Sequence, residues 1–528
     1  MAIVVATLIL GLPSSSWAKL PALGTSLSWH TASLPASAHR LRLQVNQRGA
    51  SFSHARGRGS REPPLMCASA ATSVSTELTG IVQPIPSSVK RQAVEGTCSS
   101  STLVATIFKN VVGIGVFALS SGVAGGVSLV QAAVMMLALA ALSAWSFYLL
   151  GRAALDTNSA DNDELWQRLV GPDPSVVQLG VLLMAFGSCV QYTISLVELL
   201  PSMGALFGLS AAALTGATRT AAIVALSSCL FPFCAAKDLK ALRHVSSLGF
   251  GAVIYSAAFV LTRAFDGSYA PGGRFHAAGV GAAAAMAGAS SAPPLFGFGL
   301  TATMASLAGT LNAAFMGHLN VQRYAVELRD ATPRRFGRVV AASFGLVALL
   351  SMAVALAGVH TFGTGCHGLL LLNYDLVRDT GAQLTCAATF LSVLTGYPLI
   401  FFAMRDAVEA WVHRRFTAAD VDADRDGVRQ GPRRAQLLSV LRGKKALSFV
   451  LLVFCMIGSL IAKDVAFIIS LRGALLGSLV NFAFPAFVFL RSARGRDAGR
   501  WTRRIHLAMI AYGFAGAAAS TAACLLTQ

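Results

Sequence analysis

An apolar segment of the chain is interrupted by residues that a plain membrane anchor would not contain. Residues 106–122 read TIFKNVVGIGVFALSSG and carry Lys109, Asn110 and the tetrapeptide Val112-Gly113-Ile114-Gly115. In hydrocarbon every backbone N–H and C=O needs a partner, so a mid-span break is tolerated only where protein encloses it or where it lines a cavity. Glycine lets the chain leave helical geometry at low cost, and the freed N–H groups can bind an anionic carboxylate at a positive helix terminus. The segment therefore predicts a binding site at membrane depth.

A second interruption lies at residues 312–320, which read NAAFMGHLN and include Phe315, Gly317 and His318. It falls in a helical region, 297–328, that is longer than the roughly 20 residues a straight span needs. The interrupted segments are the first members of two sets of five spans. Paired breaks at matching positions are typical of transporters built from inverted repeats, which hold substrate at the bilayer midplane between half-helix ends. Either break taken alone is also compatible with close helix packing.

The composition indicates that these segments belong to a membrane protein. The chain has 528 residues, of which 55% are hydrophobic and only 12% are charged, whereas soluble domains carry roughly 25% charged residues. The expected fold class is an all-α polytopic membrane protein. Apolar runs predict about eleven spans, beginning near Ser101, Ser128, Ser175, Ala221, Ser247, Leu295, Val340, Thr385, Ala446, Val465 and Ile505.

The net charge of +19 is carried mainly by the loops. If successive connections alternate sides, the even-numbered loops and the Lys90-Arg91 lead-in hold most of the 42 Lys and Arg residues. Nucleic acid binding would need a basic face on a soluble surface, so nucleic acid is not an expected partner. The positive-inside tendency places the even loops on the cytosolic-type side and the C-terminus on the opposite face.

Residues 1–95 differ in kind from residues 96–528, which we expect to form one transmembrane domain. Residues 2–12 are an apolar run too short to span, followed by Ser16-Trp17-Ala18, which resembles a signal-peptide cleavage site. Up to Arg61 the chain then lacks Asp and Glu and is rich in Ser, Lys and Arg, as transit peptides are. The leader resembles the bipartite peptides that lead to complex plastids, with an end near Met66-Cys67-Ala68. A disordered N-terminus without a targeting role is the alternative.

Neither the cysteines nor the one acidic loop predicts a metal site. The nine cysteines lie mostly in apolar spans, without framework spacing, and are expected to be small core residues. Residues 414–445 contain DVDADRDG, in which Asp422, Asp424, Asp426 and Gly427 fall at calcium-loop positions. The last ligand position would be Arg433, whose charge repels the metal, so a solvated linker is expected there.

At the interruptions the sequence resembles a known family, the amino acid/auxin permeases, which include vesicular, sodium-coupled and proton-coupled amino acid transporters. The resemblance runs from about Ser99 to Leu490 and is carried, in order, by FKNVVGIGVFALSSG, FGSCVQYTISLVELLPS, FMGHLNVQRYAVELRD, HTFGTGCHGLLLLNY and TGYPLIFFAMRDAV. It implies a LeuT-type fold, a 5+5 inverted repeat of about eleven helices in which helices one and six are broken. A small amino acid would then bind at the two breaks by its carboxylate and amino group. The implied substrate-binding residues are Val112, Gly113, Ile114, Gly115, Phe315 and His318.

Lys109 stands four residues before Gly113, where sodium-coupled members resemble one another in carrying asparagine and proton-coupled members show lysine. The resemblance therefore implies a coupling proton, with sodium less favoured. An ammonium at this position could replace sodium by bridging span one to hydroxyls of span eight, such as those of Ser392 or Thr395. The alternative is a lysine that snorkels to the cytosolic interface.

Other polar residues carry two interpretations each. His318 is either a proton carrier near neutral pH or a fixed hydrogen-bond partner inside the bundle. The group formed by Arg323, Glu327, Arg329 and Asp330 is either a salt-bridged gate or a solvated helix end. Ser120 stands where many members of the family have proline, which puts the stiffness of the upper half-helix in question.

These features together predict a secondary active transporter of a small, neutral amino acid, coupled to protons and independent of sodium. The chain contains no Walker motif, no nucleophile–base pair and no metal-ligand set, so neither a cofactor nor enzymatic chemistry is expected. The expected partners are the amino acid, the proton and the lipid bilayer. A non-transporting amino acid sensor on the same fold is the alternative function. The expected location is a plastid envelope, or otherwise an endomembrane or the plasma membrane.

Overall fold

The computed structural model describes residues 96–206, 218–236, 242–275, 293–299, 301–425, 444–462 and 464–526. The predicted leader, residues 1–95, lies outside these ranges, and so do Asp426, Gly427 and Arg433 of the acidic loop.

The described chain is built from α-helices and from short segments labelled η. Of these, η2, η4, η5 and η6 are 3-10 turns, and η7 and η8 are π-helical. Their order along the described residues is α2 (Ser100–Val111), η2 (Ile114–Ala118), α3 (Leu119–Ala124), α4 (Leu129–Thr157), α5 (Asn162–Leu169), α6 (Ser175–Leu206), α7 (Thr218–Cys234), α8 (Leu242–Phe265), α10 (Ala302–Ala314), η4 (His318–Asn320), α11 (Val321–Glu327), α12 (Pro333–Phe362), η5 (Gly363–Gly365), η6 (Leu370–Asn373), α13 (Thr380–Arg425), α15 (Lys444–Ile461), α16 (Val465–Arg472), η7 (Gly473–Gly477), η8 (Leu479–Ala483), α17 (Phe484–Arg491), α18 (Ala493–Arg496) and α19 (Arg500–Leu526).

Several of these helices are long and apolar enough to cross a membrane. Within the described residues there are 6 such helices, or 7 if the pair Ser100–Val111 and Ile114–Ala124, bent by 51°, is one span. Shorter apolar helices lie in α7, α8 and α15. Together with the interrupted pair α10 and α11, they follow the order of the predicted spans. The all-α polytopic class is confirmed, and the count of about eleven spans remains a prediction.

Local sequence explains where the spans begin. The Ser99 and Ser128 hydroxyls accept the Thr102 and Gln131 N–H groups at the starts of α2 and α4, which satisfies donors that a helix N-terminus leaves unpaired. At the start of α12, Thr332 caps in the same way and Pro333 occupies the first turn.

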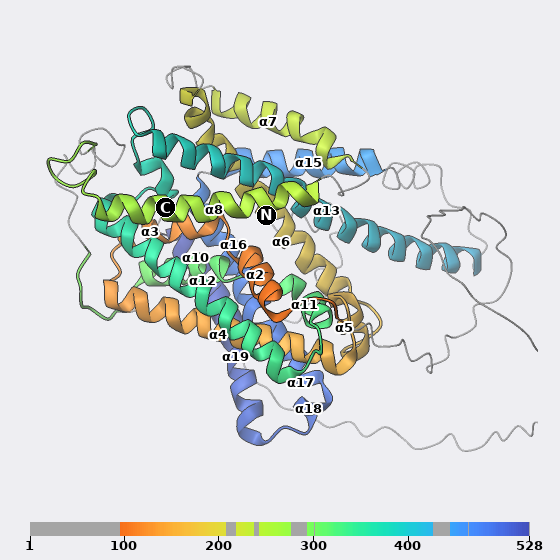
Figure 1. Ribbon diagram of the computed structural model, residues 1–528. Helices are drawn as coiled ribbons and strands as arrows, with labels where there is room; N and C mark the ends of the chain where they lie inside the picture. The colour runs from red at the N-terminus through yellow and green to blue at the C-terminus, as the bar shows by residue number, and fades with distance from the viewer. Residues whose placement is uncertain are drawn as a thin grey trace, which may run out of the picture. The chain divides into compact units, whose positions relative to one another are not determined.

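Close helix packing relies on small residues. The helix α13 packs against α6 and α8, and α12 packs against α2, α3 and α4 (Figure 1). Gly151 of α4 lies so close to the Phe336 ring of α12 that a Cβ there would clash with it. Such close approach of backbones is a main source of cohesion between membrane helices.

One expectation about the loops is wrong. Residues 414–445 were expected to be a linker throughout, but α13 extends to Arg425 and includes Asp422 and Asp424. The helix continues because residues 408–425, VEAWVHRRFTAADVDADR, contain neither glycine nor proline to end it.

The start of α2 and the end of α11, which belong to the two interrupted helices, are tied together before span one begins. The Cys98 N–H donates to the Glu327 carbonyl at 2.9 Å, and the Arg329 N–H donates to the Cys98 carbonyl at 2.9 Å. These bonds form an isolated parallel bridge between Cys98 and Leu328. The lead-in to α2 is therefore fastened to the end of α11.

Candidate functional site

The first break lies between α2 and η2, at the predicted tetrapeptide. The last α-helical bond joins the Val112 N–H to the Phe108 carbonyl at 2.8 Å, after which Gly113 takes an extended conformation, with φ −141° and ψ −165°. In the described chain, no backbone carbonyl accepts the N–H groups of Gly113, Ile114 or Gly115. This is the group of donors that an unwound helix leaves free for an anion.

Open space adjoins the first break on its glycine side. Val112 and Ile114 are buried at 4% exposure each, whereas Gly113 and Gly115 are partly exposed. A Cβ added at either glycine would meet no atom within 4 Å. Because apolar residues alternate with glycines, the Val112 and Ile114 side chains enter the core, and the backbone at Gly113 and Gly115 faces the open space.

The second break lies between α10 and η4. The α-helix ends at Ala314, and Phe315 and Gly317 depart from helical geometry before η4 begins at His318. Phe315 is fully buried, at 0% exposure. The interruption thus falls at the predicted residues.

The two breaks lie side by side. A Cβ at Gly317 would come within 2.7 Å of the Val111 Cγ2 atom and 3.4 Å of the Asn110 Nδ2 atom. The Asn320 side-chain amide donates to the Asn110 Oδ1 atom at 3.3 Å. Gly317 therefore allows the second break to pack against the end of α2.

His318 is directed toward span two. Its Nε2 atom lies 2.9 Å from the Ser146 hydroxyl, whose proton goes to the Ser143 carbonyl at 3.0 Å. The Nε2 atom and the Ser146 hydroxyl thus form a buried hydrogen bond, and the Nδ1 atom is buried without a hydrogen-bond partner among the described residues. The His318 ring also packs edge-on against Phe147, with 5.5 Å between centroids. This geometry corresponds to the fixed hydrogen-bond partner of the two interpretations.

The predicted coupling residues lie on two helices, α2 and α13, and no hydrogen bond between these residues joins the two helices in the described chain. Lys109 is a partly exposed residue of α2, one turn before the first break. The Ser392 hydroxyl donates to the Gly249 carbonyl of α8 at 3.0 Å, and the Thr395 hydroxyl donates to the Leu391 carbonyl at 2.9 Å. Within the described chain no hydrogen bond joins Lys109 to either hydroxyl, and the bridge stays a prediction.

Span three (α6) and span ten (α16 through α17) pack against each other and form a wall. This wall was not predicted to belong to the site. Arg472, the last residue of α16, donates from Nη1 to the Ser188 hydroxyl of α6 at 2.6 Å. Beyond it span ten continues as two π-helical segments, η7 and η8, a geometry that occurs frequently at functional sites. A charged residue inside an apolar span is the sequence signal that could have identified this wall.

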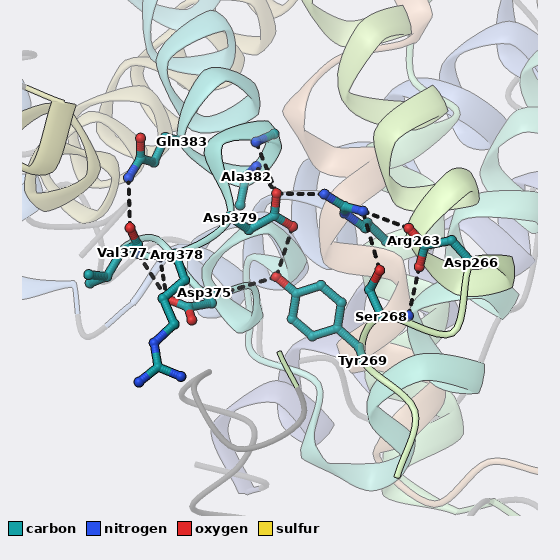
Figure 2. A network of polar contacts seen from close by, with 11 residues as sticks. Arg263, Asp266, Ser268, Tyr269, Asp375, Val377, Arg378, Asp379, Ala382 and Gln383 are labelled. Atoms are coloured by element: carbon teal, nitrogen blue, oxygen red, sulfur yellow. Dashed lines mark hydrogen bonds and ion pairs between the residues drawn. The ribbon is translucent and has the colours of Figure 1, made fainter. Parts of the chain in front are cut away.

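A second polar region lies outside the bilayer core, where span five ends and span eight begins (Figure 2). Arg263 pairs with Asp379 at 2.7 Å and with Asp266 at 2.6 Å. The Tyr269 hydroxyl donates to Asp379 at 3.1 Å and accepts the Asp375 N–H at 3.1 Å. We call these five residues the outer network.

Titration in the loops of the outer network follows from burial and hydrogen bonding. Burial raises the pKa of Tyr269 above its ordinary value, because the charged phenolate would lose its hydration. Burial also acts to raise the pKa of Asp266, but the Ser268 N–H and the Arg263 guanidinium favour the carboxylate more, so its pKa is lowered.

Glu198 and the ion pair of Arg323 with Glu327 take structural roles. Glu198 accepts the Val465 N–H at 3.1 Å, at the first turn of α16. Arg323 and Glu327 form an ion pair of 2.7 Å whose side chains are 73% and 37% exposed. An i,i+4 pair this exposed corresponds to the solvated helix end.

Ser120 occupies a tight contact between the first break and span seven. Its hydroxyl donates to the Val354 carbonyl of α12 at 3.3 Å. A Cβ at Gly358 would come within 2.8 Å of the Ser120 Cβ atom. The upper half-helix is thus held by packing against α12.

Comparison with known proteins identifies the relatives of this chain. A family described as "Transmembrane amino acid transporter protein" matches residues 96–526. The "Sodium-coupled neutral amino acid transporter 7" of Rattus norvegicus is 25% identical over 184 residues, 35% of this chain and 36% of that protein. The "Vacuolar amino acid transporter 7" of Saccharomyces cerevisiae is 23% identical over 344 residues, 62% of this chain and 64% of that protein. The chain thus matches about a third to two thirds of the length of these relatives.

A solved structure shows the fold. The inward facing conformation of Mhp1 has a TM-score of 0.51 to this chain at 12% identity, and the match covers 82% of this chain and 90% of that one. At this level of identity the likeness concerns the fold alone. The fold is of the LeuT type, with the first and sixth helices broken.

Proposed function

The chain belongs to the transmembrane amino acid transporter family, and from that premise we propose that it is a secondary active transporter of a small, neutral amino acid, coupled to protons and not to sodium. It is an integral membrane protein. The proposal joins the family to the geometry of the two breaks.

The observation that carries the proposal is the unpaired backbone at the first break. Three consecutive N–H groups, those of Gly113, Ile114 and Gly115, lack backbone acceptors within the described chain and adjoin open space beside two glycines. A substrate carboxylate would satisfy these donors at a helix terminus. Phe315 and His318 would bound the same site from the second break.

Lys109 supports coupling to protons. Its ammonium has no ion-pair partner among the described residues and lies one turn from the break. A fixed cation within a few ångströms of a sodium ion would cost on the order of several kcal/mol at an effective dielectric constant near 20. Sodium would therefore gain no useful affinity there. Movement of Lys109 toward Ser392 and Thr395 during the cycle would complete the predicted bridge.

Uptake by the purified full chain in proteoliposomes tests the function. Alanine uptake should persist without sodium and should rise with an inward proton gradient. A strict sodium requirement together with indifference to the proton gradient would contradict the proposal.

Lys109→Ala separates coupling from binding. This variant should lose concentrative uptake driven by a proton gradient more than it loses exchange of alanine across the vesicle membrane. Equal loss of both activities would instead assign Lys109 to substrate binding or folding.

For the location, we propose a plastid envelope reached through residues 1–95. Residues 1–70 fused to a fluorescent protein should enter the plastid of a host that contains a complex plastid. Delivery to a vacuolar membrane by the full chain would place the protein with its yeast relative instead.

A further inference from the structure

Arg472 is a charged residue in the first third of span ten, which runs from Val465 to Arg491. It lies seven positions after Val465, the first residue of α16, which at 1.5 Å per residue is roughly 10 Å along the helix axis. In a hydrocarbon core about 30 Å thick this depth is close to the level of the first break. Arg472 also stands at the junction where the α-helix changes to the π-helical segment η7.

The Arg472 side chain extends toward span three. A Cβ at Gly187 would lie 3.1 Å from the Arg472 Cδ atom, so this glycine makes room for the side chain. Nη1 donates to the Ser188 hydroxyl at 2.6 Å. Tyr192, one turn further along α6, lies near the guanidinium and is also close to Gly396 of α13, where a Cβ would be 3.3 Å from its ring. Arg472 and Tyr192 both keep part of their surface exposed within this wall.

The charge of Arg472 has no counter-charge in the part of the chain that the structure describes. None of the ion pairs there includes it, and its Nε atom is buried without a hydrogen-bond partner. Among the described residues, the one acceptor of its guanidinium is the Ser188 hydroxyl. An unpaired charge inside a protein is costly, and charged residues within spans mark the paths of ligands. A guanidinium has five N–H donors and no acceptor, so the missing partner must present an acceptor oxygen.

Arg472 lies on an element that contacts both breaks. The helix α16 contacts η2 of the first break and α10, which leads to the second. The neighbouring Gly473 approaches the Gly309 carbonyl of α10 so closely that a Cβ there would clash with it. The helix that carries Arg472 therefore packs beside both interrupted helices.

We propose that Arg472 binds the side-chain oxygen of the transported amino acid, an amide carbonyl or a carboxylate, and excludes side chains that carry a positive charge. This inference rests on the proposed function and extends it from the common backbone of the substrate to its side chain. An amide side chain agrees with the neutral substrate proposed above, whereas a preference for glutamate would replace that neutral class with an acidic one. The first break would bind the carboxylate of the substrate, and Arg472 would bind its side chain at the other end.

Four straight-chain amino acids of similar length test the inference. Binding of glutamine, glutamate, norleucine and lysine is measured by calorimetry on the purified full chain, and each is then tested as a competitor of alanine uptake. Wild type should bind glutamine, glutamate or both about 10- to 100-fold more tightly than norleucine, as expected for a hydrogen bond to a charged donor. The glutamine and glutamate arms distinguish an amide from a carboxylate, and lysine should bind most weakly.

Arg472→Met should remove the preference for the oxygen-bearing side chain and leave norleucine binding nearly unchanged. Arg491→Met, the same substitution at the exposed end of α17 in the same span, should leave the preference intact. If Arg472→Met does not fold, Ser188→Ala takes its place, because that change keeps the charge of Arg472 and removes only the hydroxyl that accepts from its guanidinium. It should alter the ratio of glutamine or glutamate to norleucine affinity by about 2- to 10-fold.

Two results would overturn the inference. One is a wild type that binds norleucine as tightly as both glutamine and glutamate. The other is an Arg472→Met variant that folds and keeps the wild-type preference. Failure of the proposed function looks different, because then none of the tested amino acids, alanine included, would bind or be transported.

Discussion

The first break and the outer network are both polar regions of the bundle, but their polar groups are used in opposite ways. At the break, three backbone donors lack acceptors within the described chain and adjoin open space. In the outer network, the Asp379 carboxylate, only 1% exposed, receives Arg263, the Tyr269 hydroxyl and the Gly381 N–H. The first region keeps unmet backbone donors, whereas in the second the buried Asp379 carboxylate is fully paired, although the Arg263 Nε and Asp375 Oδ2 atoms are buried without a partner among the described residues.

The difference indicates which region can respond to a ligand. Buried polar groups that are paired stiffen a structure, whereas unpaired groups cost free energy until a partner arrives. The ion pair and hydrogen bonds on Asp379 therefore hold the ends of α8 and α13 together. At the break, a bound ligand would pair the free N–H groups and gain binding free energy from them.

Gly113→Leu tests the difference between the two regions with the largest expected effect. Gly113 has an extended backbone that any residue can adopt, and its Cβ would enter open space, so the protein should fold normally. The leucine side chain would fill the space, and alanine uptake in proteoliposomes should fall at least ~100-fold, as expected when a binding site is occupied.

Gly345→Leu is the matched control for this variant. Gly345 also has open space at its Cβ, but it lies on an exposed face of α12. Its uptake should remain at the wild-type level. Normal uptake by Gly113→Leu would show that the open space at the break is not the substrate site.

Arg263→Met should produce the largest loss of stability in the outer network. The substitution leaves the buried Asp379 carboxylate without its cation, which typically costs about 3–5 kcal/mol. Thermal unfolding monitored by fluorescence should show a clear fall in Tm, whereas alanine affinity measured on the folded protein should change little. A large loss of affinity at unchanged Tm would mean that the outer network takes part in binding.

Gly317→Ala tests the contact between the first and the second break. A Cβ there would lie 2.7 Å from the Val111 Cγ2 atom, so one of the breaks must shift. Overpacking of this kind costs about 1–3 kcal/mol. We expect a moderate fall in Tm and a weakened alanine affinity together, measured on the same preparation. A change in only one of the two would separate packing at this contact from the binding geometry.

The smallest effect concerns the pH dependence of the outer network. The folded-state pKa of Asp266 is lowered, so its contribution is fully present above the unfolded pKa of roughly 3.9 and is lost as pH falls through the folded value. The Tm difference between wild type and Asp266→Asn should therefore stay constant from about pH 8 to pH 5 and shrink only in stronger acid. A difference that disappears already near neutral pH would show that another group controls the network.

The positions of the two breaks were predictable because glycine and polar residues inside an apolar run are local signals. Gly113 and Gly115 mark the first break, and Gly317 with His318 marks the second. Helix starts at Ser99 and Ser128 follow from capping in the same local way.

The contacts that complete the site could not be predicted, because they join residues far apart in the sequence. Arg472 meets Ser188 across 284 positions, and Arg263 meets Asp379 across 116. Helical periodicity gives the face of a residue but not the neighbour that covers it. For His318 the sequence left two roles open, and its bond to Ser146 on α4 depends on how spans two and six pack.

The bridge between Cys98 and Leu328 gives a way to observe the working cycle. Its two hydrogen bonds, from the Cys98 N–H and the Arg329 N–H, fasten the lead-in of α2 to the end of α11. Any movement that separates these two half-helices must release both amides to water. Deuterium uptake at these two positions would therefore count how often this end of the bundle opens, and a substrate that favours the closed arrangement would slow that exchange.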